Sequence, residues 1–311
     1  MKRTLIVAAL SAVTATSAFA QSAVTIYGRF NTTVERQDNN GAKTTQLVNN
    51  SSRLGFKGSE DLGGGLKAGF QLEHGFDSST GLPGAAFWGR QSEVNLGGGF
   101  GTLRLGRFTS EAYFATSDYI GMHNHETGTS SDALYAYVGR DTNKLAYRTP
   151  EFVKGLTVEA ALSLNEGSAA NARSYDVAAN YQLGALHLGF GYEKFGRAKQ
   201  FAVSGLYEMG SFVFGGMVQR DSDAYGSGNR TNFRGSLAYM MGASEFHVNI
   251  GKAGDYSNTP QSGATQMTLG YNYNLSKRTK VYGFYTKINA ERNTGYASDF
   301  SSLAAGVRHN F

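Results

Sequence analysis

Residues 267–275 read Met-Thr-Leu-Gly-Tyr-Asn-Tyr-Asn-Leu, and this stretch decides the fold. Its apolar residues alternate with Thr, Gly and Asn; they are Met267, Leu269, Tyr271, Tyr273 and Leu275. Successive side chains of a β-strand point to opposite faces of the sheet, so the apolar side chains share one face and the polar ones the other. The stretch therefore predicts a strand that separates an apolar from a polar environment.

The same alternation recurs along the whole chain, and it predicts sixteen strands. They fall near 24–34, 51–59, 65–76, 86–96, 101–108, 143–150, 155–165, 173–183, 185–195, 199–208, 211–220, 231–241, 244–252, 264–275, 278–289 and 299–311. An even number of runs of about ten residues is typical of an antiparallel transmembrane β-barrel of the bacterial outer membrane. A soluble β-sandwich also alternates, but it rarely places Tyr and Phe repeatedly near strand ends, as this chain does.

The connections between these strands are expected to alternate in length. Short Gly-rich turns, such as 62–65 and 183–185, are followed by longer polar loops, such as 37–50 and 221–230. Short turns on the periplasmic side and longer external loops are typical of outer-membrane barrels. No linker interrupts the pattern, so residues 21–311 are expected to form one all-β domain.

The first twenty residues have the features of a cleaved signal peptide. Lys2 and Arg3 precede an apolar run at 5–15, and Ala18-Phe19-Ala20 is a small-residue cleavage site. We therefore expect residues 1–20 to be removed on export, which leaves 27 basic and 24 acidic residues. That small positive excess does not favour a nucleic-acid partner. The chain has no Cys, so no thiolate metal site or disulfide is expected, and no cofactor is predicted.

One long segment, Gly106–Arg140, does not alternate. A loop of about 30 residues inside a compact domain is usually functional. We interpret this segment as a loop that folds into the mouth of the barrel.

Several motifs resemble those of the general diffusion porins of Gram-negative bacteria. The resemblance is carried by residues 24–29, 52–68, 99–107, 269–279 and 306–311. It implies a sixteen-stranded barrel in the outer membrane, a homotrimer, and a third external loop bent into the lumen as the constriction. It also implies that the terminal Phe311 is read by the outer-membrane assembly machinery. Gly106–Arg140 lies where this third loop is expected.

The resemblance also implies a ladder of basic side chains on one wall of the constriction, with acidic side chains on the facing loop. The motifs place the ladder at Arg29, Arg53, Arg90 and Arg140. Strand parity agrees for three of the four, whereas Arg90 shares parity with outward-facing residues and requires a β-bulge.

The facing loop departs from the family pattern. The expected constriction residues there are Asp118, His123, His125 and Glu126. Two His residues without a third ligand are weak evidence for a metal site, so none is predicted. The histidines would instead make conductance depend on pH near neutrality.

These features predict a channel for passive diffusion of ions and small hydrophilic solutes, with a mild preference for anions. A solute-specific channel of the same fold remains an alternative. An outer-membrane barrel enzyme or a purely structural barrel is a less favoured one, because no Gly-x-Ser-x-Gly elbow occurs in the chain. We therefore predict that the protein is not an enzyme.

Overall fold

The computed structural model describes residues 23–122, 134–164 and 173–311, and its strands form one antiparallel sheet. The strands are β1 (Ala23–Asn39), β2 (Ala42–Asn49), β3 (Arg53–Gly63), β4 (Leu66–Gly75), β5 (Gln91–Gly98), β6 (Gly101–Arg107), β7 (Lys144–Arg148), β8 (Leu156–Ser163), β9 (Ser174–Leu183), β10 (Leu186–Phe195), β11 (Ala198–Met209), β12 (Phe212–Ser222), β13 (Asn229–Met241), β14 (Ser244–Ala253), β15 (Ala264–Asn274), β16 (Thr279–Ala290) and β17 (Phe300–Asn310). Three short helical turns follow β6: α1 (Glu111–Tyr113), η1 (Phe114–Asp118) and η2 (Tyr119–Gly121).

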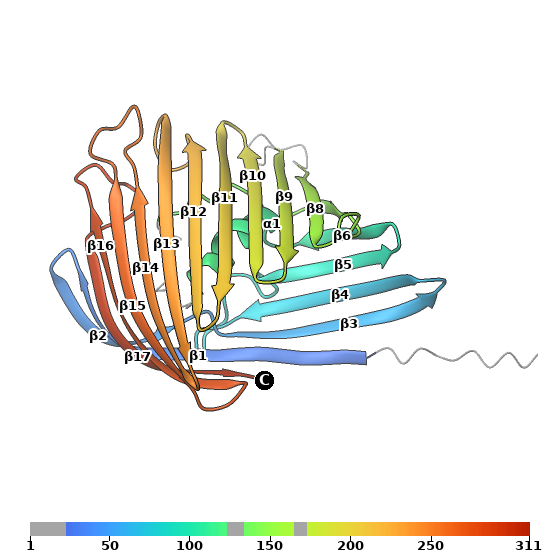
Figure 1. Cartoon of the computed structure of the whole chain (residues 1–311), viewed down its shortest axis with the longest axis horizontal. Coiled ribbons are helices and arrows are strands. Elements are labelled where there is room, and N and C mark those ends of the chain that lie inside the picture. The colour runs from blue at the N-terminus through green and yellow to red at the C-terminus, as the bar shows by residue number, and fades with distance from the viewer. Residues whose placement is uncertain (1–22, 123–133, 165–172) are drawn as a thin grey trace, which may run out of the picture.

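The sheet closes into a barrel because β1 pairs with both ends of the strand order. One edge of β1 pairs with β17. Its other edge pairs with β3 along residues 23–29 and with β2 along residues 32–39. β2 and β3 therefore lie end to end and together occupy one strand position of the barrel. The barrel therefore has sixteen strand positions, as predicted, and Figure 1 shows the C-terminal end lying beside β1.

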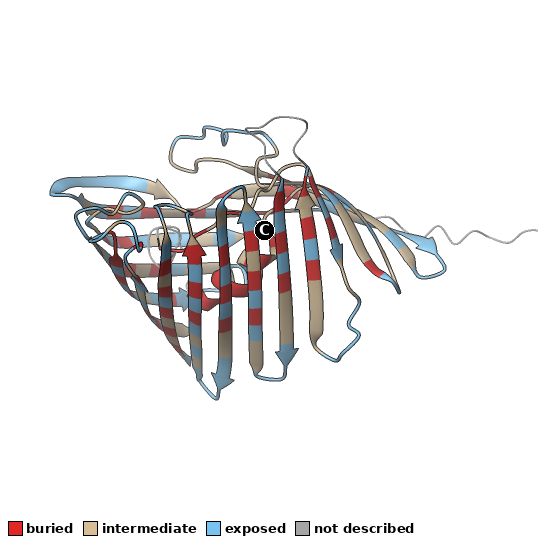
Figure 2. Ribbon diagram, turned by 90° about the horizontal axis from the view of Figure 1, so that it is seen from above, coloured by how far each residue is buried: buried red, intermediate tan, exposed pale blue. Residues whose placement is uncertain are grey.

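The two faces of the wall differ as the alternation predicts. In β10, Leu188 and Phe190 are exposed, whereas Gly189, Gly191 and Glu193 between and after them are buried. Figure 2 shows this alternation as bands along the neighbouring strands. The apolar face is the outer wall, which suits lipid, and the polar face lines the interior. No helix in the described ranges has the length and hydropathy of a membrane-crossing helix.

Two sequence predictions about this wall are wrong. Residues 37–50 were expected to be a loop, but they belong to a hairpin of β1 and β2 that turns at Asn40 and Gly41, both with positive φ. Most of β2 is exposed on both faces, so it carries no apolar alternation to detect. The second error concerns β5, which begins at Gln91 rather than near residue 86, so Arg90 precedes the strand.

The closing seam between β1 and the C-terminus depends on a glycine. The backbone of Gly28 exchanges two hydrogen bonds with Phe311, at 3.0 and 3.1 Å. A Cβ added to Gly28 would lie 2.3 Å from the Phe311 ring and 2.6 Å from the carbonyl oxygen of Arg53. The bare backbone of Gly28 therefore lets the terminal ring lie flat on β1.

We expect Gly28→Val to destabilise the folded barrel by about 1–3 kcal/mol, because the added side chain must displace the ring or the neighbouring backbone. The measurement is the temperature at which the folded band converts to the unfolded band on a gel in detergent. Gly235→Val in β13 is the matched control, since its Cβ would meet only Ile250 at an ordinary 3.6 Å. Equal transition temperatures for the two variants would contradict the role of this seam.

Candidate functional site

A row of basic side chains crosses the inner wall where the first and last strands meet. Arg29 of β1 lies directly opposite Arg53 of β3 in the pairing register. On its other edge Arg29 is opposite Asn310, two residues from Arg308 of β17. Arg308 is in turn opposite Lys280 of β16. We call Lys280, Arg308, Arg29, Arg53 and Arg90 the basic row.

Arg90 joins this row without being part of a strand. It precedes β5, so strand parity does not determine where its side chain points, and no bulge is required. Its Nε lies 2.6 Å from Glu73 Oε1, and Arg53 Nη1 lies 3.6 Å from the same oxygen. Glu73 also accepts a hydrogen bond from Tyr27 Oη at 3.0 Å. The carboxylate therefore holds two of the arginines together on the inner wall.

Two members of the basic row were missed by the sequence analysis. Arg308 lies in the Gly-Val-Arg-His-Asn-Phe motif that carried part of the resemblance, and its parity opposite Val307 places it inward. Among the described residues no partner reaches the buried Nε of Arg308. Lys280 Nζ lies 3.3 Å from Glu245 Oε2. The sequence could have identified both residues as inward-facing, because Lys280 precedes the outward-facing Val281 and Arg308 follows the outward-facing Val307.

The fourth predicted ladder residue, Arg140, lies elsewhere. It precedes β7 and its Nη1 donates to the carbonyl oxygen of Leu164 at 3.0 Å, beside the end of β8. The parity argument assumed a strand that includes Arg140, but β7 begins only at Lys144. The structure therefore does not bring Arg140 into the basic row.

The other predicted residues have separate outcomes. Asp118 is half-buried at the end of η1. His123, His125 and Glu126 lie outside the described residues. Phe311 lies on Gly28 at the barrel seam, and its role as an assembly signal stays a prediction.

The helical part of the long segment packs against inward-facing small residues of β9 and β10. Ala112 and Ala115 form a buried cluster with Ala178 of β9. The carbonyl oxygen of Ala115 lies so close to Gly189 that an added Cβ would be 1.6 Å from it. A Cβ on Gly191 would likewise lie 2.7 Å from the Ala112 carbonyl oxygen. These glycines allow α1 and η1 to lie directly on the wall.

Glu193 of β10 anchors both ends of this segment to the wall. Its Oε2 accepts backbone hydrogen bonds from Val138 at 3.0 Å and from Gly139 at 3.2 Å. Its Oε1 accepts a hydrogen bond from the hydroxyl of Ser110, which also caps α1. The side chain is fully buried. One carboxylate therefore connects residues that begin and end the loop.

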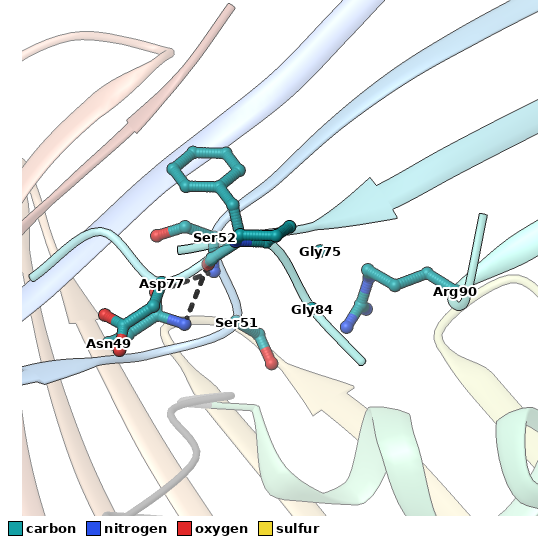
Figure 3. Close-up of a pocket in the computed structure, with 9 residues that line it drawn as sticks. Asn49, Ser51, Ser52, Gly75, Asp77, Gly84 and Arg90 are labelled. Carbon is teal, nitrogen blue, oxygen red and sulfur yellow. Dashed lines mark hydrogen bonds between the residues drawn. The ribbon is translucent and has the colours of Figure 1, made fainter. Parts of the chain in front are cut away.

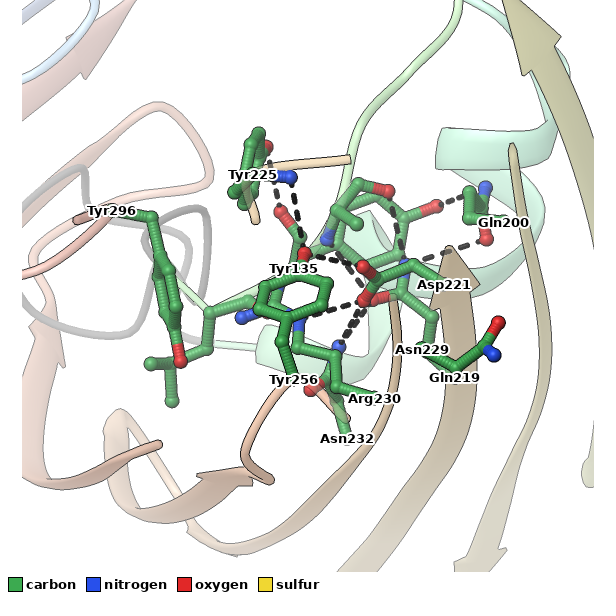
Figure 4. Close-up of polar contacts among 12 residues, drawn as sticks. Tyr135, Gln200, Gln219, Asp221, Tyr225, Asn229, Arg230, Asn232, Tyr256 and Tyr296 are labelled. Atoms are coloured by element: carbon green, nitrogen blue, oxygen red, sulfur yellow. Dashed lines mark hydrogen bonds and ion pairs between the residues drawn. The ribbon is translucent and has the colours of Figure 1, made fainter. Parts of the chain in front are cut away.

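A second anchor holds the returning part of the loop against β12 and β13 (Figure 4). Gln219 hydrogen-bonds both the backbone N–H and the carbonyl oxygen of Ala136, at 2.9 and 3.0 Å. Arg230 donates to the carbonyl oxygen of Leu134 at 3.1 Å and pairs with Asp221 at 2.7 Å. The guanidinium is surrounded by tyrosine rings, with centroids 5.4, 4.9 and 4.2 Å from its Cζ; they belong to Tyr225, Tyr256 and Tyr296.

Acidic side chains gather near α1, in a network whose charges are paired. Arg104 bridges Glu93 at 2.8 Å and Glu159 at 2.9 Å. Arg148 bridges Glu159 at 2.9 Å and Glu111 at 2.5 Å. Burial raises the pKa of Glu111, the acid on α1, although Arg148 acts in the opposite direction. Through these pairs the acids and arginines of neighbouring strands form one charged network beside α1.

An open pocket lies beside the basic row, at the break between β2 and β3 (Figure 3). Its volume is about 320 Å³, and Ser51, Ser52, Asp77 and Arg90 contribute to its lining. Asn49 bridges the pocket wall by accepting from the Ser52 N–H and donating to the Phe76 carbonyl oxygen. Arg90 therefore contributes both to the basic row and to the lining of this pocket.

We expect Glu193→Ala to release the loop from the wall. Four donors would lose a buried acceptor: the backbone N–H groups of Val138 and Gly139, the Ser110 hydroxyl and the Gln200 amide. Each costs about 1–3 kcal/mol when left unsatisfied. The measurement is single-channel current noise and the voltage at which channels close. The matched control is Glu208→Ala, an exposed residue near the end of the neighbouring strand β11. Unchanged noise and closing voltage in Glu193→Ala would contradict the anchoring role.

Taken together, a closed barrel with an apolar outer wall and a charged inner wall defines a membrane channel of the porin class. A family model described as Gram-negative porin matches residues 6–293. The chain is 32% identical to outer membrane porin protein 32 of Delftia acidovorans, over 91% of this chain and 88% of the relative. It is 29% identical to major outer membrane protein P.IB of Neisseria meningitidis serogroup B, over 100% of both chains.

Among solved structures, the anion-selective porin from Comamonas acidovorans has a TM-score of 0.76 at 26% identity, covering 94% of this chain and 100% of that one. The chain therefore belongs to the Gram-negative porin family and is a protein of the outer membrane.

Proposed function

We propose that this porin passes ions and small hydrophilic solutes by passive diffusion and prefers anions. The observation that carries the preference is the basic row, in which four arginines and a lysine face the interior, with the carboxylates of Glu73 and Glu245 beside them. A wall with one sign of charge concentrates counter-ions and sets selectivity in a pore. The similarity of this chain to the anion-selective porin from Comamonas acidovorans is consistent with this proposal.

The segment Gly106–Arg140 is proposed to narrow the channel as its constriction loop. Its described helical part packs on the inner faces of β9 and β10, and Glu193 and Arg230 hold its returning part. The described part of the loop carries two acids, Glu111 and Asp118, and it packs on β9 and β10, which lie far from the basic row in the closed strand order. Glu111 is paired with Arg148. His123, His125 and Glu126 are proposed to complete the loop side.

The remaining proposals rest on the family resemblance. The protein is expected to assemble as a homotrimer, to lose residues 1–20 on export, and to present Phe311 to the assembly machinery. Light scattering of the detergent-purified protein measures the oligomer mass directly.

The experiment that tests the channel is a planar-bilayer recording of the refolded protein under a KCl gradient. Ohmic steps whose reversal potential lies toward the chloride equilibrium potential are the expected result. A correctly folded barrel that gives no steps would overturn the open channel and favour a structural barrel. Saturation and block by one solute would instead favour a solute-specific channel.

A further inference from the structure

Three connections at the mouth of the barrel reach the long segment. They are residues 223–228, 254–263 and 291–299, which we call the rim loops. They follow β12, β14 and β16, and these strands run in the same direction as β6. The rim loops therefore lie at the same end of the barrel as Gly106–Arg140, beside the segment proposed as the constriction.

Tyr225 of the first rim loop connects the exposed surface to the backbone of the long segment. The residue is 40% exposed. Its hydroxyl donates to the carbonyl oxygen of Tyr135 at 3.0 Å and accepts from the backbone N–H of Tyr137 at 3.2 Å. Between these two residues, both backbone groups of Ala136 are bonded to Gln219 of the wall. Residues 135–137 are therefore held from the wall by one side chain and from the rim by another.

The Arg230 guanidinium brings all three rim loops together (Figure 4). It contacts one tyrosine ring from each of them, and the nearest ring is that of Tyr296, with its centroid 4.2 Å from Cζ. A guanidinium over an aromatic face is attracted by the quadrupole of the ring. The same guanidinium donates to the carbonyl oxygen of Leu134. One cation of the wall therefore contacts the three rim loops and the returning part of the long segment.

Further contacts join the rim loops to one another. The hydroxyl of Tyr256 donates to Asp221 at 2.5 Å and accepts from the backbone N–H of Tyr225 at 3.0 Å. The hydroxyl of Tyr296 donates to the carbonyl oxygen of Ser262 at 2.8 Å, and its ring packs against the buried cluster that contains Leu134. Continuous networks of packed side chains and hydrogen bonds carry energetic coupling between separate positions. Displacement of one rim loop therefore alters the contacts that hold residues 134–137.

We propose that the rim loops control the constriction from the outer surface of the protein. With Tyr225, Tyr256 and Tyr296 seated around Arg230, they hold residues 134–137 against the wall and keep the channel open. Displacement of a rim loop frees this part of the long segment to move into the lumen. The three tyrosines are positioning residues, since they act through the long segment and not on the permeating ion. The inference rests on the proposed function of Gly106–Arg140 as the constriction loop.

The first test is hydrogen–deuterium exchange of the refolded full chain in detergent, read by mass spectrometry over residues 134–139. Tyr225→Phe keeps the ring and removes the hydroxyl, so two hydrogen bonds to the long segment are lost. We expect exchange of these amides to become roughly tenfold faster. Tyr175→Phe is the matched control, because Tyr175 is an exposed outward residue of β9, and it should exchange as the unmodified protein does.

The second test acts on another rim loop and adds the voltage at which single channels close. Tyr296→Ala removes a ring from Arg230 and from the Leu134 cluster. We expect faster exchange at 134–139 and closure at a lower voltage, because fewer contacts then resist movement of the long segment. Asn293→Ala is the control in the same rim loop, since its side chain bonds Pro260 of a neighbouring rim loop, and both readouts should be unchanged.

Exchange is measured without any current, so the two proposals can fail separately. Equal exchange over 134–139 in Tyr296→Ala and Asn293→Ala would overturn the control by the rim loops, even in a protein that conducts normally. Faster exchange with an unchanged closing voltage would also overturn it, because the contacts would then be structural only. A lack of current from the unmodified protein would instead overturn the proposed channel, and the control of its opening with it.

Discussion

Replacing Arg308 by glutamate is expected to move the reversal potential in a KCl gradient away from that of chloride. The substitution changes the charge of the basic row by two units at the position between Lys280 and Arg29. Two unit charges about 4 Å apart in water interact by about 1 kcal/mol, so the reversal is worth up to about 2 kcal/mol for an ion at contact. We expect the chloride-to-potassium permeability ratio to fall roughly fivefold.

The barrel should tolerate this change. The new carboxylate would lie opposite Lys280, so the substitution creates a cross-strand pair rather than a repulsion. High salt should reduce the difference between the variant and the unmodified protein, because the Debye length shortens to about 3 Å at 1 M.

Arg140→Glu is the matched control for this prediction. It makes the same change of charge at a residue that the motifs had placed in the ladder, but the side chain bonds to Leu164 at the end of β8. Its permeability ratio should remain within about twofold of the unmodified protein. A larger effect from Arg140→Glu than from Arg308→Glu would contradict the basic row and restore the ladder expected from the motifs.

The second large effect is expected from Gly189→Val, which should reduce single-channel conductance at least about twofold. A valine Cβ would lie 1.6 Å from the Ala115 carbonyl oxygen, a contact that only a shift of η1 can relieve. The loop remains held at Glu193 and Gln219, so we expect its helical part to move toward the axis of the barrel. Overpacking of this kind also costs about 1–3 kcal/mol or more of stability.

Gly216→Val in β12 separates this clash from the general effect of valine in a strand. A Cβ at Gly216 would have only the Arg234 carbonyl oxygen nearby, at 3.9 Å, and it would point outward. Its conductance should match that of the unmodified protein. Normal conductance for Gly189→Val with a folded barrel would show that the helical segment does not need this contact.

The strands could be predicted because the residue pattern of each strand depends only on the lipid and the polar interior on its two sides. Lipid outside and polar groups inside impose a period of two on every strand, so a run such as 267–275 needs no tertiary information. The same parity correctly placed Arg29 and Arg53 on the inner wall. It failed for the β1–β2 hairpin, whose second strand is mostly exposed on both faces.

The sequence alone was therefore sufficient for a sixteen-position barrel, its lipid-facing side and two members of the basic row. The remaining members depended on contacts between distant segments. Arg90 and Arg140 both lie outside strands, so their side chains are placed by Glu73 and by the end of β8 rather than by any period. Arg308 joins Arg29 only when the last strand pairs with the first, because closure alone brings opposite ends of the chain into one register.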